Sequence, residues 1–164
     1  MLILRCVRVD ILVLLVVANS TPVLLSMLLA ERWATAIDAG RVLTDGRPVL
    51  GPHKTWRGLL GGTLATGAIG ALWPVGFVTG AAVGFCALLG DLVSSCIKRR
   101  AGLSSGADSL LLDQLPEGLV PMLILYQPLG LDLVSLPGTL AVFVLLALGA
   151  AKLFTYRRTP GAAP

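Results

Sequence analysis

Two acidic residues lie within stretches that otherwise have the composition of membrane helices. Asp91 follows the apolar run 83–90, and Asp113 follows three leucines. A carboxylate at hydrocarbon depth costs about 2.5–3.5 kcal/mol on insertion scales, so chains usually retain one for metal binding, proton relay or ion pairing. The alternative is that either aspartate lies at the membrane interface and is solvated. Because both acids adjoin basic or glycine-containing segments, we take them as the candidate site.

The residues after Asp91 extend this candidate site along one helical face. Ser94, Ser95 and Lys98 follow Asp91 at spacings of three, four and seven residues, which places all four on the same side of a helix. Such a stripe could bind a cation at its base and a phosphate at its cationic end. The alternative is a simple ion pair between Asp91 and Lys98 across two turns.

A second polar segment, residues 31–57, precedes the next apolar run. Near its end it contains Gly51, Lys54 and Thr55, followed by the glycine-containing start of the next expected helix. Backbone N–H groups that can be approached closely, the positive end of a helix and an ammonium group together suit an anionic phosphate. The spacing of a Walker A motif is absent. The alternative is a basic loop that holds anionic lipid headgroups.

The composition excludes a soluble globular protein. Hydrophobic residues make up 55% of the 164-residue chain, charged residues 13%, and the mean hydropathy is +0.86, which leaves too little polar surface for a soluble fold. About 20 apolar residues span a bilayer. We therefore expect an all-α integral membrane protein, with a single transmembrane catalytic domain over 1–164 and cytoplasmic loops at 31–57 and 98–109. The five expected membrane helices are 11–30, 58–77, 78–97, 110–129 and 138–154.

The basic residues indicate how these helices are oriented. With five spans, 11 of the 13 Lys and Arg residues fall on one side, and only Arg5 and Arg8 fall on the other. The positive-inside rule then places both loops and the C-terminus in the cytoplasm and the N-terminus outside the cell (inner) membrane. Polar residues 19–22 predict a kink in the first helix, and Pro116 and Pro121 predict a break in the fourth.

Several separate motifs resemble the CDP-archaeol synthase family, which is related to the phosphatidate cytidylyltransferases. They are GPHKTWRGLLGG at 51–62, GDLVSSCIKRR at 90–100, LLDQL at 111–115, and the shorter segments 18–22 and 37–40. The resemblance extends from about residue 18 to the last helix. It implies transfer of CMP from CTP to a lipid phosphate, which gives a CDP-lipid and pyrophosphate, with Mg²⁺ as cofactor.

The resemblance also assigns roles by position. It implies Asp91 and Asp113 as metal ligands and, with Lys98, as catalytic residues. The residues that it implies for substrate binding are Lys54, Thr55, Arg57, Ser95, Arg99, Asn19 and Asp38. In two places the chain departs from its relatives. The His-Gly-Gly of the phosphatidate enzymes has no counterpart, and the final acid of the archaeal pattern Asp-Gln-Leu-Asp is replaced by Pro116, although Glu117 follows.

The expected reaction depends on charge rather than on a covalent enzyme intermediate. CTP and the lipid phosphate are both anionic, so bound metal and basic side chains would lower their repulsion. The expected partners are CTP, a lipid phosphate and membrane lipids, without nucleic acid; a homo-oligomer and the chemistry of the lipid tails remain open. Two alternatives are a purely structural helical subunit and a small cation transporter that uses Asp91 and Asp113. The latter predicts inverted repeats, and the two halves of the chain show no evident self-similarity.

Overall fold

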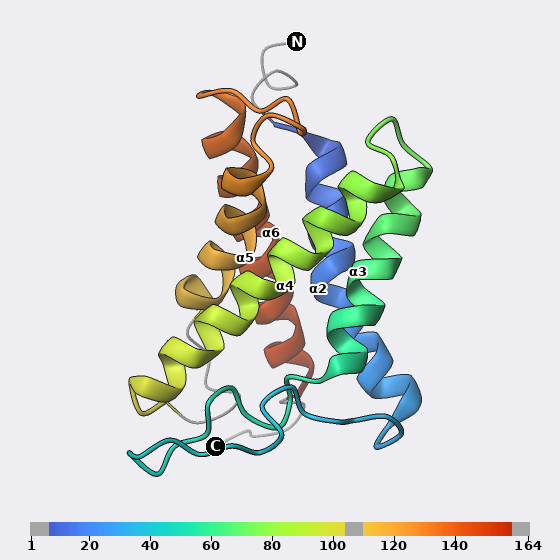
Figure 1. The fold of residues 1–164 in the computed structure, drawn as a ribbon. Helices are drawn as coiled ribbons and strands as arrows, with labels where there is room; N and C mark the ends of the chain where they lie inside the picture. The colour runs from blue at the N-terminus through green and yellow to red at the C-terminus, as the bar shows by residue number, and fades with distance from the viewer. Residues whose placement is uncertain (1–6, 104–109, 159–164) are drawn as a thin grey trace.

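The computed structural model describes residues 7–103 and 110–158, and these form a bundle of five helices (Figure 1). The helices are α2 (Val9–Leu29), α3 (Trp56–Ala71), α4 (Phe77–Arg100), α5 (Leu110–Ile124) and α6 (Ser135–Arg158). The expected all-α fold with five helices is confirmed. Arg5 and residues 104–109 of the second expected loop lie outside the described residues.

Two spans are shorter than the sequence predicts. Helix α5 ends at Ile124, whereas the expected span continues to residue 129. Helix α3 ends at Ala71, whereas the expected span continues to residue 77. The turn between α3 and α4 contains Pro74, and Gly76 adopts a φ of +79°, a left-handed conformation that glycine reaches without strain. This turn therefore ends α3 early and reverses the chain into α4.

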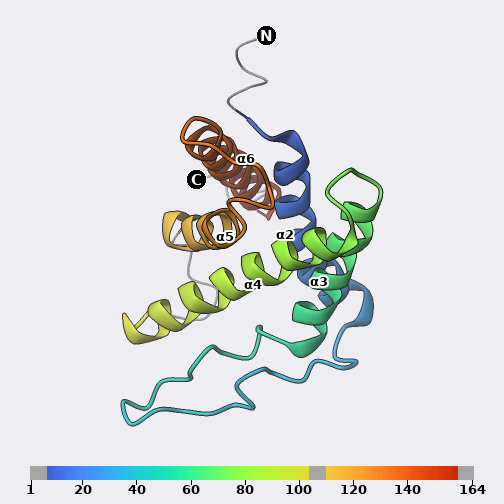
Figure 2. The ribbon, with the colours of Figure 1, turned by 45° about the horizontal axis from the view of Figure 1, so that its top comes forward.

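Helix α4 occupies the centre of the bundle. Successive helices run in alternating directions, so the start of α2 and the end of α6 lie at opposite ends (Figure 1). Figure 2 shows α4 crossing obliquely between α3 and α5. It packs on α2, α3 and α5, while α6 packs on α5 and α2. The polar stripe on α4 is therefore within reach of three other helices.

Small residues allow α3 and α4 to approach closely. A Cβ built on Gly70 would lie 2.9 Å from the Cα of Gly80, and one on Gly84 would lie 2.7 Å from the Thr66 side chain. Real Cβ atoms essentially never approach other atoms this closely, so the crossing requires glycine at both positions. In a membrane, where lipid tails are as apolar as Leu, such close packing is a main source of helix association.

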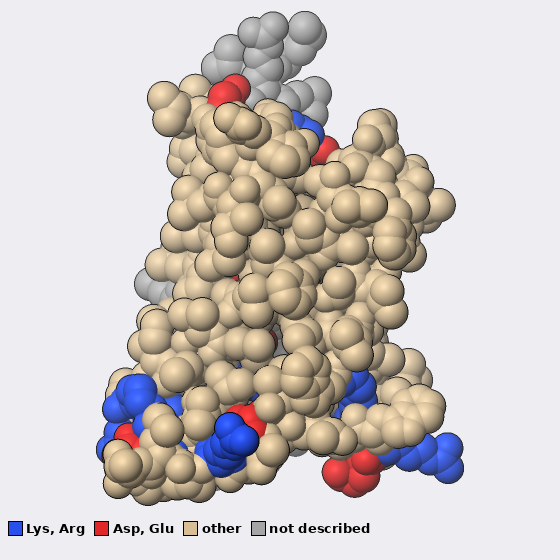
Figure 3. Space-filling view, in the orientation of Figure 1, with Lys and Arg blue, Asp and Glu red and all other residues tan. Residues whose placement is uncertain are grey.

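The surface is apolar around the middle of the bundle and charged at one end. Leu64 in the middle of α3 and Leu145 in the middle of α6, for example, are 59% and 67% exposed. Helices α2 and α4 are long and apolar enough to cross a membrane, and Ser135–Ala150 is a shorter apolar helix. Charged side chains gather at the lower end, around the loop between α2 and α3, with few at the other end (Figure 3). This distribution fits a bundle embedded in a membrane with one polar face.

Prolines do not interrupt the helices that contain them. The predicted break at Pro116 and Pro121 is wrong, because α5 runs without interruption from Leu110 to Ile124. Helix α2 likewise continues through Pro22, and next to it the Thr21 hydroxyl donates a hydrogen bond to the Val17 carbonyl. Membrane helices tolerate proline because side-chain hydroxyls and neighbouring helices satisfy or cover the affected backbone groups.

Candidate active site

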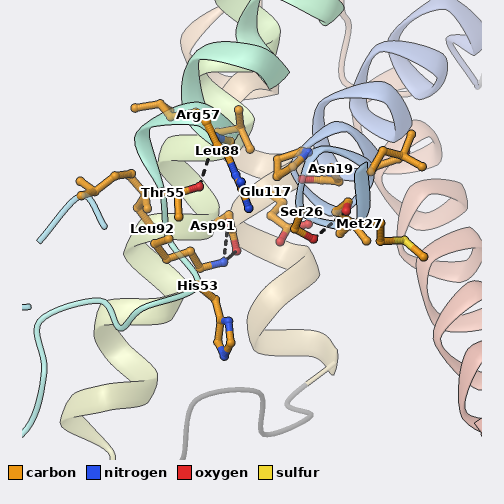
Figure 4. Close-up of a pocket in the computed structure, with 18 of the residues that line it drawn as sticks. Asn19, Ser26, Met27, His53, Thr55, Arg57, Leu88, Asp91, Leu92 and Glu117 are labelled. Carbon is orange, nitrogen blue, oxygen red and sulfur yellow. Dashed lines mark hydrogen bonds and ion pairs between the residues drawn. The ribbon is translucent and has the colours of Figure 1, made fainter. Parts of the chain in front are cut away.

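A cavity of about 1100 Å³ lies where α2, α3, α4 and α5 meet the polar end of the bundle. Its polar wall includes side chains from four helices and from the loop before α3 (Figure 4). They are Asn19 of α2, Lys54 and Thr55 before α3, Arg57 of α3, Asp91 of α4 and Glu117 of α5. The opposite wall is apolar and comes mainly from α2 and α6, with Val16, Val23, Leu24, Met27, Leu146 and Ala147. The cavity can therefore hold a molecule with a charged end and an apolar end.

Lys54 and Asp91 form an ion pair at the polar end of the cavity. The Lys54 Nζ lies 2.7 Å from Oδ1 and 2.6 Å from Oδ2 of Asp91. Both side chains are only partly exposed, so this pair is less screened by solvent than a surface pair. The pairing joins the loop before α3, predicted to bind a phosphate, to the part of α4 that was predicted to bind a cation.

Lys98 pairs with a different acid from the one that shares its helix. Its Nζ lies 2.7 Å from Oδ1 and 2.9 Å from Oδ2 of Asp113 on α5. The structure therefore does not contain the alternative ion pair between Asp91 and Lys98 along α4. Lys98 and Asp113 do not line the cavity that Asp91 lines. The two candidate acids thus belong to two separate lysine–aspartate pairs.

The remaining polar residues near the end of α4 are buried against the bundle. Ser94, Ser95 and Arg99 are each at most 5% exposed. The Ser94 hydroxyl donates to the backbone carbonyl of Asp91, which is ordinary bonding within a helix. Ser95 and Arg99 lie near Lys98 along the helix. The two basic side chains at this end of α4, Lys98 and Arg99, are therefore surrounded by protein rather than by bulk water.

Thr55, Arg57 and Asn19, which the resemblance implies for substrate binding, line the cavity. The Thr55 side chain caps α3 by accepting a hydrogen bond from the N–H of Gly58. Arg57 donates to the backbone carbonyl of Arg32. The Nδ2 of Asn19 is buried and has no hydrogen-bond partner among the described residues. An unpaired buried donor is costly, so this amide is suited to an acceptor from a bound molecule.

Asp38 lies outside this cavity and organises the loop that leads to Lys54. Its carboxylate accepts hydrogen bonds from the backbone N–H groups of Gly40, Leu50 and Gly51, at 2.9–3.0 Å. Burial raises the pKa of this carboxyl, but the three backbone donors outweigh burial and hold the pKa below its ordinary value. The contacts of Asp38 are therefore those of a residue that shapes the loop.

The sequence analysis named Glu117 only as the acid that follows Pro116 and did not include it among the candidate site residues. Its side chain is 7% exposed and lines the cavity together with Asp91. A signal was available, because Glu117 follows Asp113 by four residues and so shares its helical face. His53 also borders the cavity, but it is exposed and its ring points away from Asp91 (Figure 4).

The carboxylates present suit a hard divalent cation only when a ligand completes the site. Among the described residues, no group of three His, Cys, Asp or Glu side chains is arranged to hold a metal. Mg²⁺ typically binds proteins through one or two carboxylates and takes further oxygens from phosphates and water. The oxygen donors on the cavity wall therefore fit Mg²⁺ bound together with a nucleotide.

Comparisons with known proteins agree on one family. A family model for CDP-archaeol synthase matches residues 72–157. A CDP-archaeol synthase of Hyperthermus butylicus is 44% identical over 104 residues, which cover 60% of this chain and 59% of the relative. One of Methanospirillum hungatei is 35% identical over 128 residues, which cover 68% of this chain and 77% of the relative.

A solved structure has the same fold. It is described as an intramembrane enzyme for the biosynthesis of archaeal membrane lipids, and it superposes with a TM-score of 0.74 at 33% identity. The similarity covers 87% of this chain and 91% of that chain. It therefore extends over most of the chain rather than over one shared motif.

Proposed function

The chain belongs to the CDP-archaeol synthase family, and we propose that it transfers CMP from CTP to a lipid phosphate of the archaetidic or phosphatidic acid type. The products are a CDP-lipid and pyrophosphate. The observation that carries this proposal is the single cavity with the Lys54–Asp91 pair at one end and apolar walls at the other. A nucleotide phosphate and the headgroup of a lipid can meet there.

The apolar wall supports a lipid as the acceptor. Met27 and Leu146 line the cavity and are also more than half exposed on the outer surface of the bundle. The wall of the cavity is thus continuous with the surface that would face lipid tails. A lipid phosphate could keep its tails among these side chains while its headgroup approaches Asp91 and Lys54.

Charge neutralisation is the main contribution that we assign to the protein. The lipid phosphate is already ionised, so its oxygen can attack the α-phosphorus of CTP without a general base. The bond between that phosphorus and the oxygen that leads to the β-phosphate breaks, and pyrophosphate leaves. Lys54, Lys98 and Arg99 lower the repulsion between the reacting phosphates. Mg²⁺, held by cavity carboxylates that include Asp91, would supply further positive charge to the phosphate oxygens.

The lysines must change partners when CTP binds. In the structure Lys54 is held by Asp91, and Lys98 by Asp113. These pairs keep the buried charges compensated and hold both ammonium groups near the site. We assign them the phosphates of CTP as their new partners in the complex.

The charged end of the bundle is proposed to face the cytoplasm, where CTP is found. Trp56 and Trp73 are partly exposed near the two ends of α3, about 26 Å apart along a helix of 1.5 Å rise per residue. Tryptophan is enriched at both interfaces of a membrane, so these two residues mark its boundaries. This placement gives a multi-pass protein of the cell membrane with its N-terminus outside and its C-terminus in the cytoplasm.

The direct test is an assay of the purified protein with CTP labelled in the α-phosphate. It should be offered archaetidic acid, phosphatidic acid and, as a control, the corresponding dephosphorylated lipids. We expect a labelled CDP-lipid and an equal amount of pyrophosphate with at least one lipid phosphate, and no product with the controls. The absence of labelled lipid with every lipid phosphate would exclude the proposed function.

A further inference from the structure

The loop between α2 and α3 presents two large apolar side chains far from the cavity. Val42 is 57% exposed and Leu43 is 47% exposed, although Arg41 and Thr44 flank them in the sequence. The transfer reaction gives neither residue a role, because neither lines the cavity. Adjacent apolar side chains that stay exposed and are surrounded by polar residues are typical of a surface that binds a protein or a membrane.

A short hairpin holds these two side chains in place. Val42 forms an antiparallel bridge with Pro48, and the N–H of Leu43 donates a hydrogen bond to the carbonyl of Arg47 at 2.9 Å. The N–H of Gly46 in turn donates to the carbonyl of Leu43 at 2.9 Å. We call residues 41–48 the hairpin tip, and its backbone bonds present Val42 and Leu43 on an ordered surface.

The loop is attached to helix ends at both its base and its tip. At the base, Ala36 forms an antiparallel bridge with Thr55, the residue directly before α3. At the tip, Asp45 forms an ion pair with Arg100, the last residue of α4, at 2.7 Å. Figures 1 and 2 both show the loop running along the lower end of the bundle toward the end of α4. The hairpin tip therefore lies at the charged end of the bundle and does not project freely from it.

The attachment point continues an apolar stripe of α4. Val93, Ile97 and Arg100 are separated by four and three residues, so they share one helical face. Val93 is 51% exposed and Ile97 is 46% exposed, and in a membrane these two side chains contact lipid tails. Arg100 follows them on the same face and binds the hairpin tip through Asp45. The hairpin tip is thus attached where a lipid-facing stripe reaches the membrane surface.

The charges around the hairpin tip suit an anionic surface. Arg41, Arg47 and Arg100 lie in it or contact it, against the single acid Asp45. Basic residues close to a membrane attract anionic headgroups, and apolar side chains beside basic ones are typical of segments that lie in the membrane interface. Continuity with the lipid-facing stripe of α4 favours a lipid surface over a protein partner.

We propose that the hairpin tip docks on the anionic lipid surface at the charged end of the bundle. Val42 and Leu43 insert among the headgroups, and the basic side chains around them lie next to lipid phosphates. This inference rests on the membrane placement given under the proposed function and is independent of CMP transfer. Because the loop continues to Lys54, docking also steadies the segment that carries this lysine.

The test measures the depth of Leu43 with a nitroxide spin label. Leu43→Cys is labelled in the full-length protein with its three native cysteines replaced by alanine, and it is placed in nanodiscs of equal parts phosphatidylglycerol and phosphatidylcholine. Power saturation should show more collisions with oxygen than with a water-soluble nickel complex, as for a label at Val93→Cys. A label at His53→Cys, an exposed position of the same loop, is the aqueous control. A Leu43 label as accessible to nickel as the His53 label would overturn the proposal.

The contribution of headgroup charge is tested in nanodiscs of phosphatidylcholine alone. There the nickel accessibility of the Leu43 label should rise several-fold, because the neutral surface no longer attracts the basic side chains. Equal accessibility in the two kinds of nanodisc would overturn the assignment of an anionic surface. Water exposure of Leu43 in both would indicate a protein partner instead and would also overturn the proposal.

Unlabelled protein covers the case in which the cysteine variants do not fold. Hydrogen exchange of wild-type residues 41–48 should be several-fold slower in the anionic nanodiscs than in the neutral ones, and equal exchange would overturn the proposal. The double variant Val42→Ser, Leu43→Ser should lose this difference. Leu133→Ser, the matched control, replaces an apolar side chain that is 89% exposed between α5 and α6 and should keep it. Neither measurement depends on turnover, so a failure of CMP transfer is read separately.

Discussion

The side chains of Arg47 and Arg100 each donate a hydrogen bond to the backbone carbonyl of the other residue. Nη1 of Arg47 donates to the carbonyl of Arg100 at 2.7 Å, and Nη2 of Arg100 donates to the carbonyl of Arg47 at 3.2 Å. Asp45 completes the contact with an ion pair to Arg100 at 2.7 Å. This clasp attaches the loop between α2 and α3 to the last turn of α4. The loop continues to Lys54, so the clasp helps to hold that lysine near Asp91.

Loss of the clasp should loosen the loop without removing a phosphate ligand. We expect Arg100→Ala to raise the KM for CTP several-fold and to leave the KM for lipid almost unchanged. Chymotrypsin should also cut the loop around Leu43 faster than in wild type. Arg41→Ala, an exposed residue of the same loop, is the control and should behave as wild type. Equal cleavage rates in Arg100→Ala and wild type would show that the clasp does not order the loop.

The basic end of the bundle should be cytoplasmic. A reporter that is active only outside the cytoplasm should give no signal when fused to the C-terminus, because the basic residues of the loops and of the end of α6 resist translocation. The same reporter at the N-terminus should be active. Strong activity of the C-terminal fusion would contradict the proposed orientation.

Replacement of Lys54, Lys98 or Arg99 should change the KM for CTP more than the KM for the lipid phosphate. Replacing any one of them by Ala removes a charge-assisted contact worth about 1.5–3 kcal/mol, which corresponds to roughly a ten- to hundredfold increase in the KM for CTP. The KM for the lipid phosphate should change much less. Steady-state kinetics with each substrate varied in turn separates the two, and an unchanged constant for CTP in all three variants would refute the assignment.

Asp91 and Asp113 should both be needed for CMP transfer, but for different reasons. Asp91→Asn removes a full negative charge from the cavity wall, where a neutral amide attracts a dication far less. Asp113→Asn removes the carboxylate that forms the ion pair with Lys98. We expect both variants to fold, as judged by circular dichroism and gel filtration, yet to lose activity that added Mg²⁺ does not restore. Near-normal turnover by Asp91→Asn would show that the carboxylate mechanism is wrong.

Asp38 should make the stability of the protein depend on acid pH. Its pKa is held below the ordinary value of 3.8, so the folded state binds a proton less readily than the unfolded state. The resulting stability is present above the unfolded pKa and is lost as the pH falls through the folded pKa. The Tm of wild type should therefore fall across this acid range. Asp38→Asn should have a lower Tm at neutral pH and a flatter acid profile, and parallel profiles would rule out this contribution of Asp38.

The sequence alone determined the class of the protein, and five of its ten candidate site residues line the cavity. Composition gave five helices, because the length of an apolar run is a local property that a bilayer constrains directly. The spacing from Asp91 to Lys98 gave one polar stripe, because residues separated by three, four and seven positions share a helical face. The same local rules predicted a break at Pro116 and Pro121, and here they failed, because packing against neighbouring helices allows α5 to continue.

Only the tertiary structure decided which charges meet. Lys54 pairs with Asp91, Lys98 turns to Asp113, and Glu117 reaches the cavity. Each of these contacts joins different segments of the chain. The partner that each charged side chain meets depends on the angle and distance at which the helices cross. At the α4–α5 crossing that distance is set by the missing side chain of Gly90, which lets the backbone of α5 touch α4 beside Asp91. Helical periodicity assigns a residue to a face, but contacts between helices determine what that face meets.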